Sequence, residues 1–146
     1  MFPSLKPLAC LALALAIVPA AHANDRKVMK PFQEAVRNAT AAGKLDGTVK
    51  FYLAGSGPSG QVVQANVVTN RKTNAFGKSD DKACDWAAQS ALISLQDAAK
   101  KAGANAVVNI VSYYKKDVND DPANYECHAG AVIAGVALKG DLAIVK

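Results

Sequence analysis

Several residue types on which enzyme and metal sites depend are scarce in this 146-residue chain. It has two histidines, His22 and His128, three cysteines and one tryptophan. With so few imidazoles, and no serine or free thiol tied to one by a recognisable motif, the sequence gives no support for hydrolytic catalysis. Long apolar runs are also rare. Only residues 8–18 form one, and no later stretch is long enough to cross a bilayer.

The first residues have the organisation of a secretory signal peptide. One charge, Lys6, precedes the apolar run, and small residues, including Ala21 and Ala23, follow it where an export peptidase reads them. We predict cleavage after Ala23, so that residues 1–23 are removed, and a periplasmic or secreted location. Cys10 lies inside the apolar run, a position that does not fit lipidation.

The mature chain, residues 24–146, is expected to be one soluble domain, because about 120 residues are enough for a single continuous core. The full chain has a formal net charge of +5 at pH 7. Its basic residues are scattered, which is typical of a solvated surface and does not predict a nucleic-acid partner. The candidates for contact with a polyanion are Arg71, Lys72 and Lys78.

Cys84 and Cys127 are the two cysteines that remain after cleavage. In an exported protein an even count most simply indicates a disulfide, which would stabilise the fold by roughly 4 kcal/mol. The alternative is a metal site formed by both cysteines and His128, since thiolate and imidazole suit zinc or copper. Neighbours on an extended chain point to opposite sides, so Cys127 and His128 would converge poorly, and the disulfide is favoured. We expect no cofactor.

The hydrophobic pattern predicts an α+β domain. Two helices are expected, over 30–43 and 82–102. Four strands are expected, over 48–54, 61–69, 106–114 and 129–138. The simplest arrangement is a four-stranded, mainly antiparallel sheet with the long helix and the shorter N-terminal helix packed on it.

The remaining segments are expected to be tails, turns and loops. Residues 24–30 should form a flexible tail, and residues 115–125 a polar loop. The glycine-rich segment 55–60 should close a hairpin between the first two strands. Gly135, inside the last strand, indicates a bulge or a close approach of the backbone. Trp86, Tyr113 and Tyr114 would supply an aromatic ligand surface, although packing is the commoner role of such residues.

Gly77-Lys78-Ser79 has the last three letters of a phosphate-binding loop, but the rest of the motif is missing. The first glycine of that motif would fall on position 72, which is a lysine. Asp80 and Asp81 occupy the helix start where phosphate oxygens would lie. We therefore interpret the segment as a helix start, with Ser79 or Asp81 as the N-cap.

The segment Gly103-Ala104-Asn105-Ala106-Val107-Val108, where a helix runs directly into a strand, resembles the YbjQ-like superfamily, also described as heavy-metal-binding domains. It is similar as well to the disulfide-bonded periplasmic domain of the Rcs stress-sensing outer-membrane lipoprotein. Residues 83–88 and 125–131, which contain the two cysteines, resemble short exported proteobacterial proteins of unknown function that are often named excinuclease ATPase subunit. These resemblances cover about residues 48–138.

The resemblance implies an α+β fold and, in the YbjQ-like branch, ring-forming oligomers, but it supplies no catalytic residue. The sequence does not support an excinuclease or ATPase activity. We expect a small, soluble, non-catalytic periplasmic protein that binds another envelope component or self-associates through a sheet edge or helix face. The second hypothesis is metal binding or sensing through Cys84, Cys127 and His128, with Glu126 as an added oxygen ligand.

Overall fold

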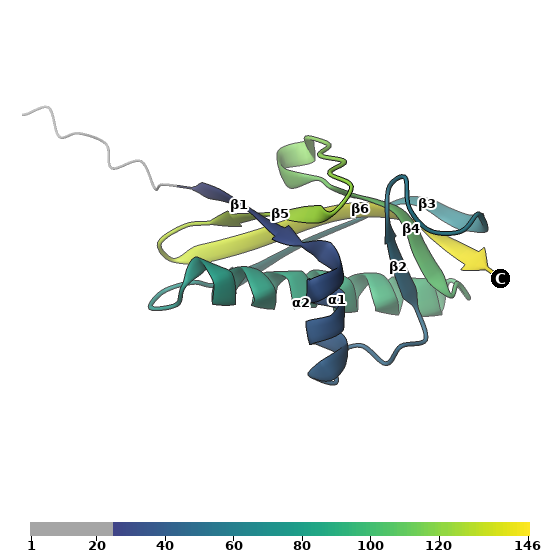
Figure 1. Ribbon diagram of the computed structural model, residues 1–146, viewed down its shortest axis with the longest axis horizontal. Coiled ribbons are helices and arrows are strands. Elements are labelled where there is room, and N and C mark those ends of the chain that lie inside the picture. The colour runs from purple at the N-terminus through teal and green to yellow at the C-terminus, as the bar shows by residue number, and fades with distance from the viewer. Residues whose placement is uncertain (1–24) are drawn as a thin grey trace, which may run out of the picture.

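The computed structural model describes residues 25–146, so the leader and its cleavage point lie outside the described residues. The described chain forms one sheet with α1 and α2 on one side of it (Figure 1). Its elements are β1 (Arg26–Pro31), α1 (Phe32–Ala41), β2 (Lys50–Leu53), β3 (Gly60–Asn74), α2 (Asp80–Lys101), β4 (Ala106–Ser112), the 3-10 helix η1 (Tyr114–Lys116), β5 (Asn124–Ala129) and β6 (Ile133–Val145). The architecture is α+β, as the sequence predicts.

The sheet is organised around β6. On one side β6 pairs antiparallel with β3 along nearly its whole length. On the other side it pairs antiparallel with β5 and then with β4. Outside these, β1 pairs antiparallel with β5, and β2 pairs parallel with β4. The sheet is therefore mainly antiparallel, as expected, but it has six strands and one parallel pair.

Three predictions of local structure are corrected by these pairings. Arg26–Pro31, expected to lie in a flexible tail, form β1 on the edge of the sheet. Residues 124 and 125, expected in a loop, begin β5. The predicted hairpin between β2 and β3 does not form, because β2 pairs with β4 and β3 with β6. Each error concerns long-range strand pairing, which local periodicity does not encode.

Helix α2 lies across the sheet and begins as predicted. The Ser79 hydroxyl accepts a hydrogen bond from the amide of Lys82 at 3.2 Å, and Asp80 and Asp81 lie in the first turn. Small side chains on the buried face let the helix approach the sheet closely. They are Ala83, Ala87, Ala88, Ala91 and Ala99.

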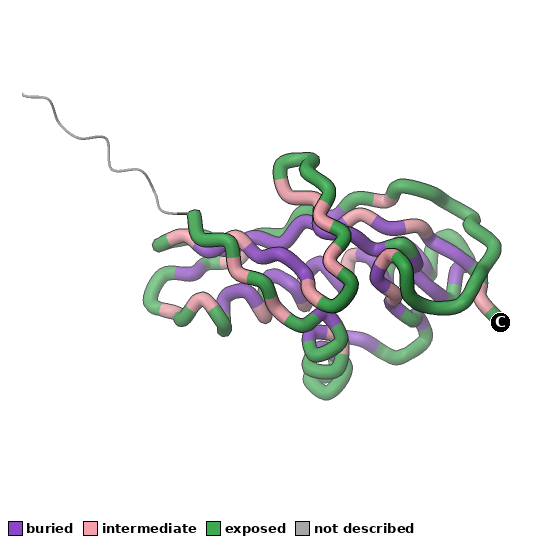
Figure 2. The backbone as a smooth tube through the Cα atoms, turned by 45° about the horizontal axis from the view of Figure 1, so that its top comes forward, coloured by how far each residue is buried: buried purple, intermediate pink, exposed green. Residues whose placement is uncertain are grey.

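The core lies between the helices and the inner face of the sheet. Figure 2 shows the buried stretches running along the central strands and the helix, with exposed residues at the turns. The largest fully buried side chains include Phe32 of α1, Leu92 and Leu95 of α2, and Tyr125 of β5. Among residues 25–146, no helix is long and apolar enough to cross a membrane.

Candidate functional site

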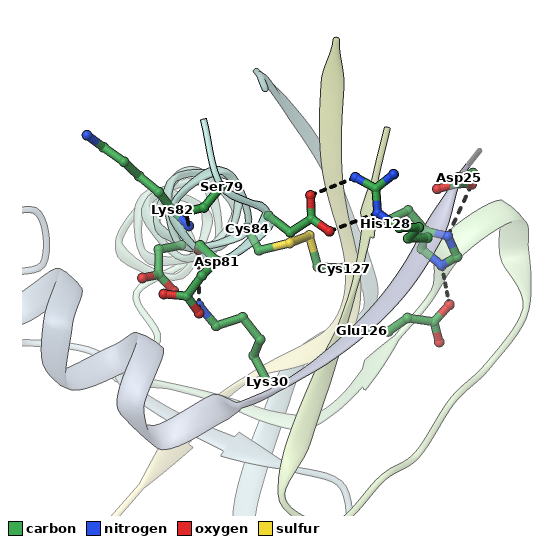
Figure 3. The surroundings of a disulfide bond; sticks show 12 residues. Asp25, Lys30, Ser79, Asp81, Lys82, Cys84, Glu126, Cys127 and His128 are labelled. Atoms are coloured by element: carbon green, nitrogen blue, oxygen red, sulfur yellow. Dashed lines mark hydrogen bonds and ion pairs between the residues drawn. A yellow bond between two sulfur atoms is a disulfide. The ribbon is translucent and has the colours of Figure 1, made fainter. Parts of the chain in front are cut away.

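A disulfide joins the helical layer to the sheet. Cys84 in the first turns of α2 and Cys127 in β5 are bonded, with sulfur atoms 2.08 Å apart and both residues fully buried (Figure 3). The predicted disulfide is thereby confirmed. Because the bond uses both sulfurs, neither cysteine offers a thiolate beside His128. Within the described residues, no group of three or more His, Cys, Asp or Glu side chains is placed to hold a metal ion.

Strand β5 directs alternate side chains to opposite faces of the sheet. Tyr125, Cys127 and Ala129 face α2 and are buried. Glu126 and His128 point to the other face, away from the disulfide (Figure 3). Cys127 and His128 therefore point apart, as the sequence analysis expects of neighbours on an extended chain. The disulfide consequently fixes the strand that carries His128.

His128 is the centre of a polar cluster on this outer face. Its Nε2 contacts Oε1 of Glu126, and its Nδ1 lies 3.2 Å from Oδ2 of Asp25. The hydroxyl of Tyr114 donates to the same Asp25 oxygen at 2.7 Å, and this bond raises the pKa of Tyr114. The Tyr114 ring also stacks on the imidazole. Three segments therefore meet at one histidine: the residue before β1, the helix η1 and the strand β5.

Glu126 is the one buried charged residue in the described part of the chain, with 7 % of its surface exposed. Its Oε2 accepts a hydrogen bond from Nδ2 of Asn119 at 2.8 Å and lies 3.4 Å from Nζ of Lys27. Burial opposes ionisation of the carboxyl, but the hydrogen bonds from His128 and Asn119 and the charge of Lys27 outweigh it. The pKa of Glu126 is therefore lowered.

Two pockets share the Tyr114–His128 pair as a wall. The first has a volume of about 330 Å³ and a mainly apolar lining. Its other lining residues are Asp25, Lys72, Gly130, Ala131, Val132, Ile133 and Gly135. The second, of about 550 Å³, is polar, and its lining includes Lys27, Asn119 and Glu126. The site thus consists of a polar cluster with an apolar pocket on one flank.

The apolar pocket owes its space to Gly135. This residue pairs with His128 on β5 and with Lys72 on β3, so that the three residues form a row across neighbouring strands. A Cβ atom at position 135 would meet only Cγ of Lys72 at 3.5 Å and the carbonyl oxygen of Arg71 at 3.6 Å, both ordinary contacts. The strand register is regular here. Gly135 therefore marks a hollow in the sheet surface, and neither the bulge nor the close approach of the backbone expected from the sequence is found.

The three basic residues considered for polyanion contact do not form one group. Nη2 of Arg71 donates to Oγ of Ser94 on α2 at 3.0 Å. Lys72, next in the strand, lines the apolar pocket on the outer face. Nζ of Lys78 donates to the carbonyl oxygen of Asn74 at 3.0 Å. Arg71 thus lies on the face of the sheet that α2 covers, and Lys72 lies on the opposite face.

Asp25, Lys27 and Asn119 belong to the cluster but are not predicted by the sequence. Asp25 and Lys27 lie in the segment taken for a tail, and Asn119 in a loop, so no local pattern linked them to His128. The sequence of β5 does contain a pattern that points to the site: Tyr125, Cys127 and Ala129 alternate with the polar residues Glu126 and His128. Recognising that period of two would have placed the carboxylate and the imidazole on one face.

The geometry limits the chemistry available at the site. Both ring nitrogens of His128 face carboxylates, and both oxygens of Glu126 are bonded or paired within the protein. The polar side of the site is thus bonded within the protein, and the pocket beside it has mainly apolar walls. Comparison of the chain with protein-family models, with curated proteins and with solved structures gave no match.

Proposed function

We propose that this chain is a small, soluble, periplasmic binding protein without catalytic activity, and that it holds an apolar group of another envelope component in the pocket beside Gly135. The observation that carries the proposal is the hollow between His128 and Lys72, bordered by polar groups that are already satisfied by one another. Such a pocket can bury an apolar group without leaving a protein carboxylate or imidazole unpaired.

The dimensions of the pocket indicate the kind of group it accepts. A volume of about 330 Å³ is near the lower end for small-molecule sites, and it suits an aromatic ring or a branched aliphatic side chain. Val132 and Ile133 supply apolar contact, and the ring of Tyr114 supplies a flat wall. Of the two charged residues in the lining, Asp25 is bonded to Tyr114 and His128, so Lys72 favours a group that carries or adjoins a negative charge.

The disulfide supports an extracytoplasmic location, because such bonds persist in oxidising compartments. We propose on the same basis, together with the export signal and the short motifs, that the chain is related to the exported proteins of the YbjQ-like and Rcs-lipoprotein type. The α+β architecture and the helix-to-sheet disulfide are compatible with that relationship. We propose no ATPase or excinuclease activity for it.

The pocket is tested with 8-anilinonaphthalene-1-sulfonate, a fluorescent probe with aromatic rings and one negative charge. Gly135→Val should fill part of the hollow, and its Cβ atom would make only ordinary contacts. The control Asn70→Val adds the same side chain to the outer face of β3, outside the pocket. We expect saturable binding to the wild type and to Asn70→Val, and at least about a tenfold loss of affinity in Gly135→Val. Equal affinity in all three would contradict the assignment.

The absence of catalysis is tested separately. The purified protein should not hydrolyse ATP or a broad set of ester and peptide substrates above the rate of a His128→Asn variant. A turnover that His128→Asn abolishes, in a variant that melts like the wild type, would make the Glu126–His128 pair catalytic and overturn this part of the proposal.

A further inference from the structure

The turn between β5 and β6 and the loop between β3 and α2 expose large apolar side chains at one end of the molecule. Phe76 is 74 % exposed, Val132 59 % and Ile133 53 %. The two segments are in contact, since the amide of Ala75 donates to the carbonyl oxygen of Val132 at 2.7 Å. Phe76, Val132 and Ile133 line one open groove, and we call them the apolar tip. In Figure 1 both segments lie at the end opposite the C-terminus.

Lysines surround the apolar tip. Lys72 lines the same groove. The ammonium groups of Lys78 and Lys82 lie 5.1 Å and 5.5 Å from the centre of the Trp86 ring, which is itself 45 % exposed. Lys78 connects the two parts, because it also bonds the carbonyl oxygen of Asn74 in the groove. Apolar, indole and ammonium groups therefore occur together on this surface.

The neighbouring acidic residues are paired with other cations, although three carboxylates share two positive charges. Asp80 receives two hydrogen bonds from Arg26, at 2.7 and 2.9 Å, which lower the pKa of its carboxyl. Asp81 lies 2.6 Å from Nζ of Lys30, and Asp85 contacts the same ammonium group. Within residues 25–146, the lysines around the tip, Lys72, Lys78 and Lys82, form no ion pair. These three lysines outnumber the one carboxylate charge that Arg26 and Lys30 leave unbalanced, so this end carries a net positive charge.

We propose that the apolar tip docks on the surface of an anionic lipid bilayer. Phe76, Val132 and Ile133 enter the interface, and the surrounding lysines contact the anionic headgroups. Aromatic and aliphatic side chains on protruding turns, beside an exposed indole and lysines, match the composition of an interfacial membrane contact. An exposed apolar patch marks a contact with a protein or with a membrane, and the lysines around this one favour an anionic membrane surface. Val132, Ile133 and Lys72 also line the pocket at Gly135, but Phe76 and Trp86 do not, so the inference goes beyond the proposed function and is tested at Phe76 and Lys78.

Trp86 provides a built-in reporter because it is the only tryptophan of the chain. The protein, purified from a periplasmic extract, is mixed with vesicles of phosphatidylglycerol or of phosphatidylcholine. Binding is measured by co-sedimentation and by the Trp86 emission. We expect a blue shift and co-sedimentation with phosphatidylglycerol only. Phe76→Ser should weaken the partition about tenfold through lost apolar burial, and Lys78→Glu about tenfold through lost attraction.

Matched controls separate the tip from general surface effects and from the pocket. Val118 is as exposed as Val132 but belongs to the segment between η1 and β5, and Lys44 follows α1. Val118→Ser and Lys44→Glu should bind vesicles like the wild type, as should the pocket-filling Gly135→Val. Conversely, Phe76→Ser should keep its affinity for the fluorescent probe. Failure of the docking proposal and failure of the proposed function are thereby distinguishable.

Two results would overturn the docking proposal. One is a wild-type protein that stays in the supernatant with an unchanged Trp86 emission on phosphatidylglycerol vesicles. In that case, loss of capture of an envelope protein by Phe76→Ser would assign the tip to a protein partner instead. The other is equal binding to both lipids without an effect of Lys78→Glu, because anionic recognition requires that charge.

Discussion

The ring of Tyr114 lies on the imidazole of His128, with ring centroids 3.4 Å apart and planes inclined by 9°. This stack joins η1, in the long connection between β4 and β5, to the outer face of β5. It also forms the wall shared by the apolar and the polar pocket. The shape of the candidate site therefore depends on an aromatic contact as well as on the hydrogen bonds around Asp25 and Glu126.

Tyr114 is expected to contribute through its ring more than through its hydroxyl. Tyr114→Phe removes the 2.7 Å bond to Asp25 and should lower the free energy of unfolding by about 1 kcal/mol while the stack persists. Tyr114→Ala removes the stack and the pocket wall, and should also abolish binding of the fluorescent probe. Urea unfolding and probe titration measure the two effects. Undiminished probe binding by Tyr114→Ala would show that the probe lies elsewhere.

Removing the hydroxyl of Tyr125 should have the opposite effect on stability to removing that of Tyr114. Tyr125 is 1 % exposed, and its hydroxyl has no hydrogen-bond partner in the described structure. Burial accordingly raises the pKa of this tyrosine. Because no bond is lost, Tyr125→Phe should leave the free energy of unfolding unchanged or raise it by up to about 1 kcal/mol. A loss as large as that of Tyr114→Phe would mean that a bound water satisfies the hydroxyl.

Glu126 should make the stability depend on pH in the acidic range. Its folded-state pKa is lowered, so its contribution is fully present above the unfolded value of about 4.3 and is lost as the pH falls through the lower folded value. Glu126→Gln should cost about 1–3 kcal/mol at neutral pH and progressively less below pH of about 4. The control is Asp97→Asn, on an exposed position of α2. A deficit that does not shrink in acid would contradict the ionised, hydrogen-bonded carboxylate.

The disulfide should account for a large share of the stability. Cys84 and Cys127 are 43 positions apart in the sequence, and the crosslink restricts the unfolded chain accordingly. The double variant Cys84→Ala/Cys127→Ala should lose about 2–5 kcal/mol. Thermal unfolding with and without reductant provides the test. Reductant should lower the melting temperature of the wild type and leave that of the double variant unchanged, whereas insensitivity of both would refute the stabilising role.

The features that the sequence predicted correctly are those with local signals. Helix α2 combines an N-cap at Ser79, acidic residues in its first turn and an alanine-rich buried face, all readable within one segment. The disulfide followed from the count of cysteines in an exported chain, and the opposed directions of Cys127 and His128 followed from strand geometry. None of these depends on how distant strands pair.

The features that were missed arise from tertiary pairing. Strand β1 has no strong alternation of its own and is held by its register with β5. The cluster around His128 gathers Asp25 from the segment before β1 and Asn119 from a loop, and no sequence motif links these residues to His128. Gly135 was recognised as unusual, but its effect, a hollow opposite His128, requires the registers of both neighbouring strands.

The proposal of an exported, disulfide-linked, metal-free binding protein is tested most directly by the intact mass of the protein from a periplasmic extract. The mass is measured under native conditions, then after denaturation with alkylation, with and without reductant. We predict a chain that begins at Asn24, carries no metal ion and takes up alkylating reagent only after reduction. Two free thiols together with a retained metal ion would contradict this prediction and would make Cys84, Cys127 and His128 a metal site.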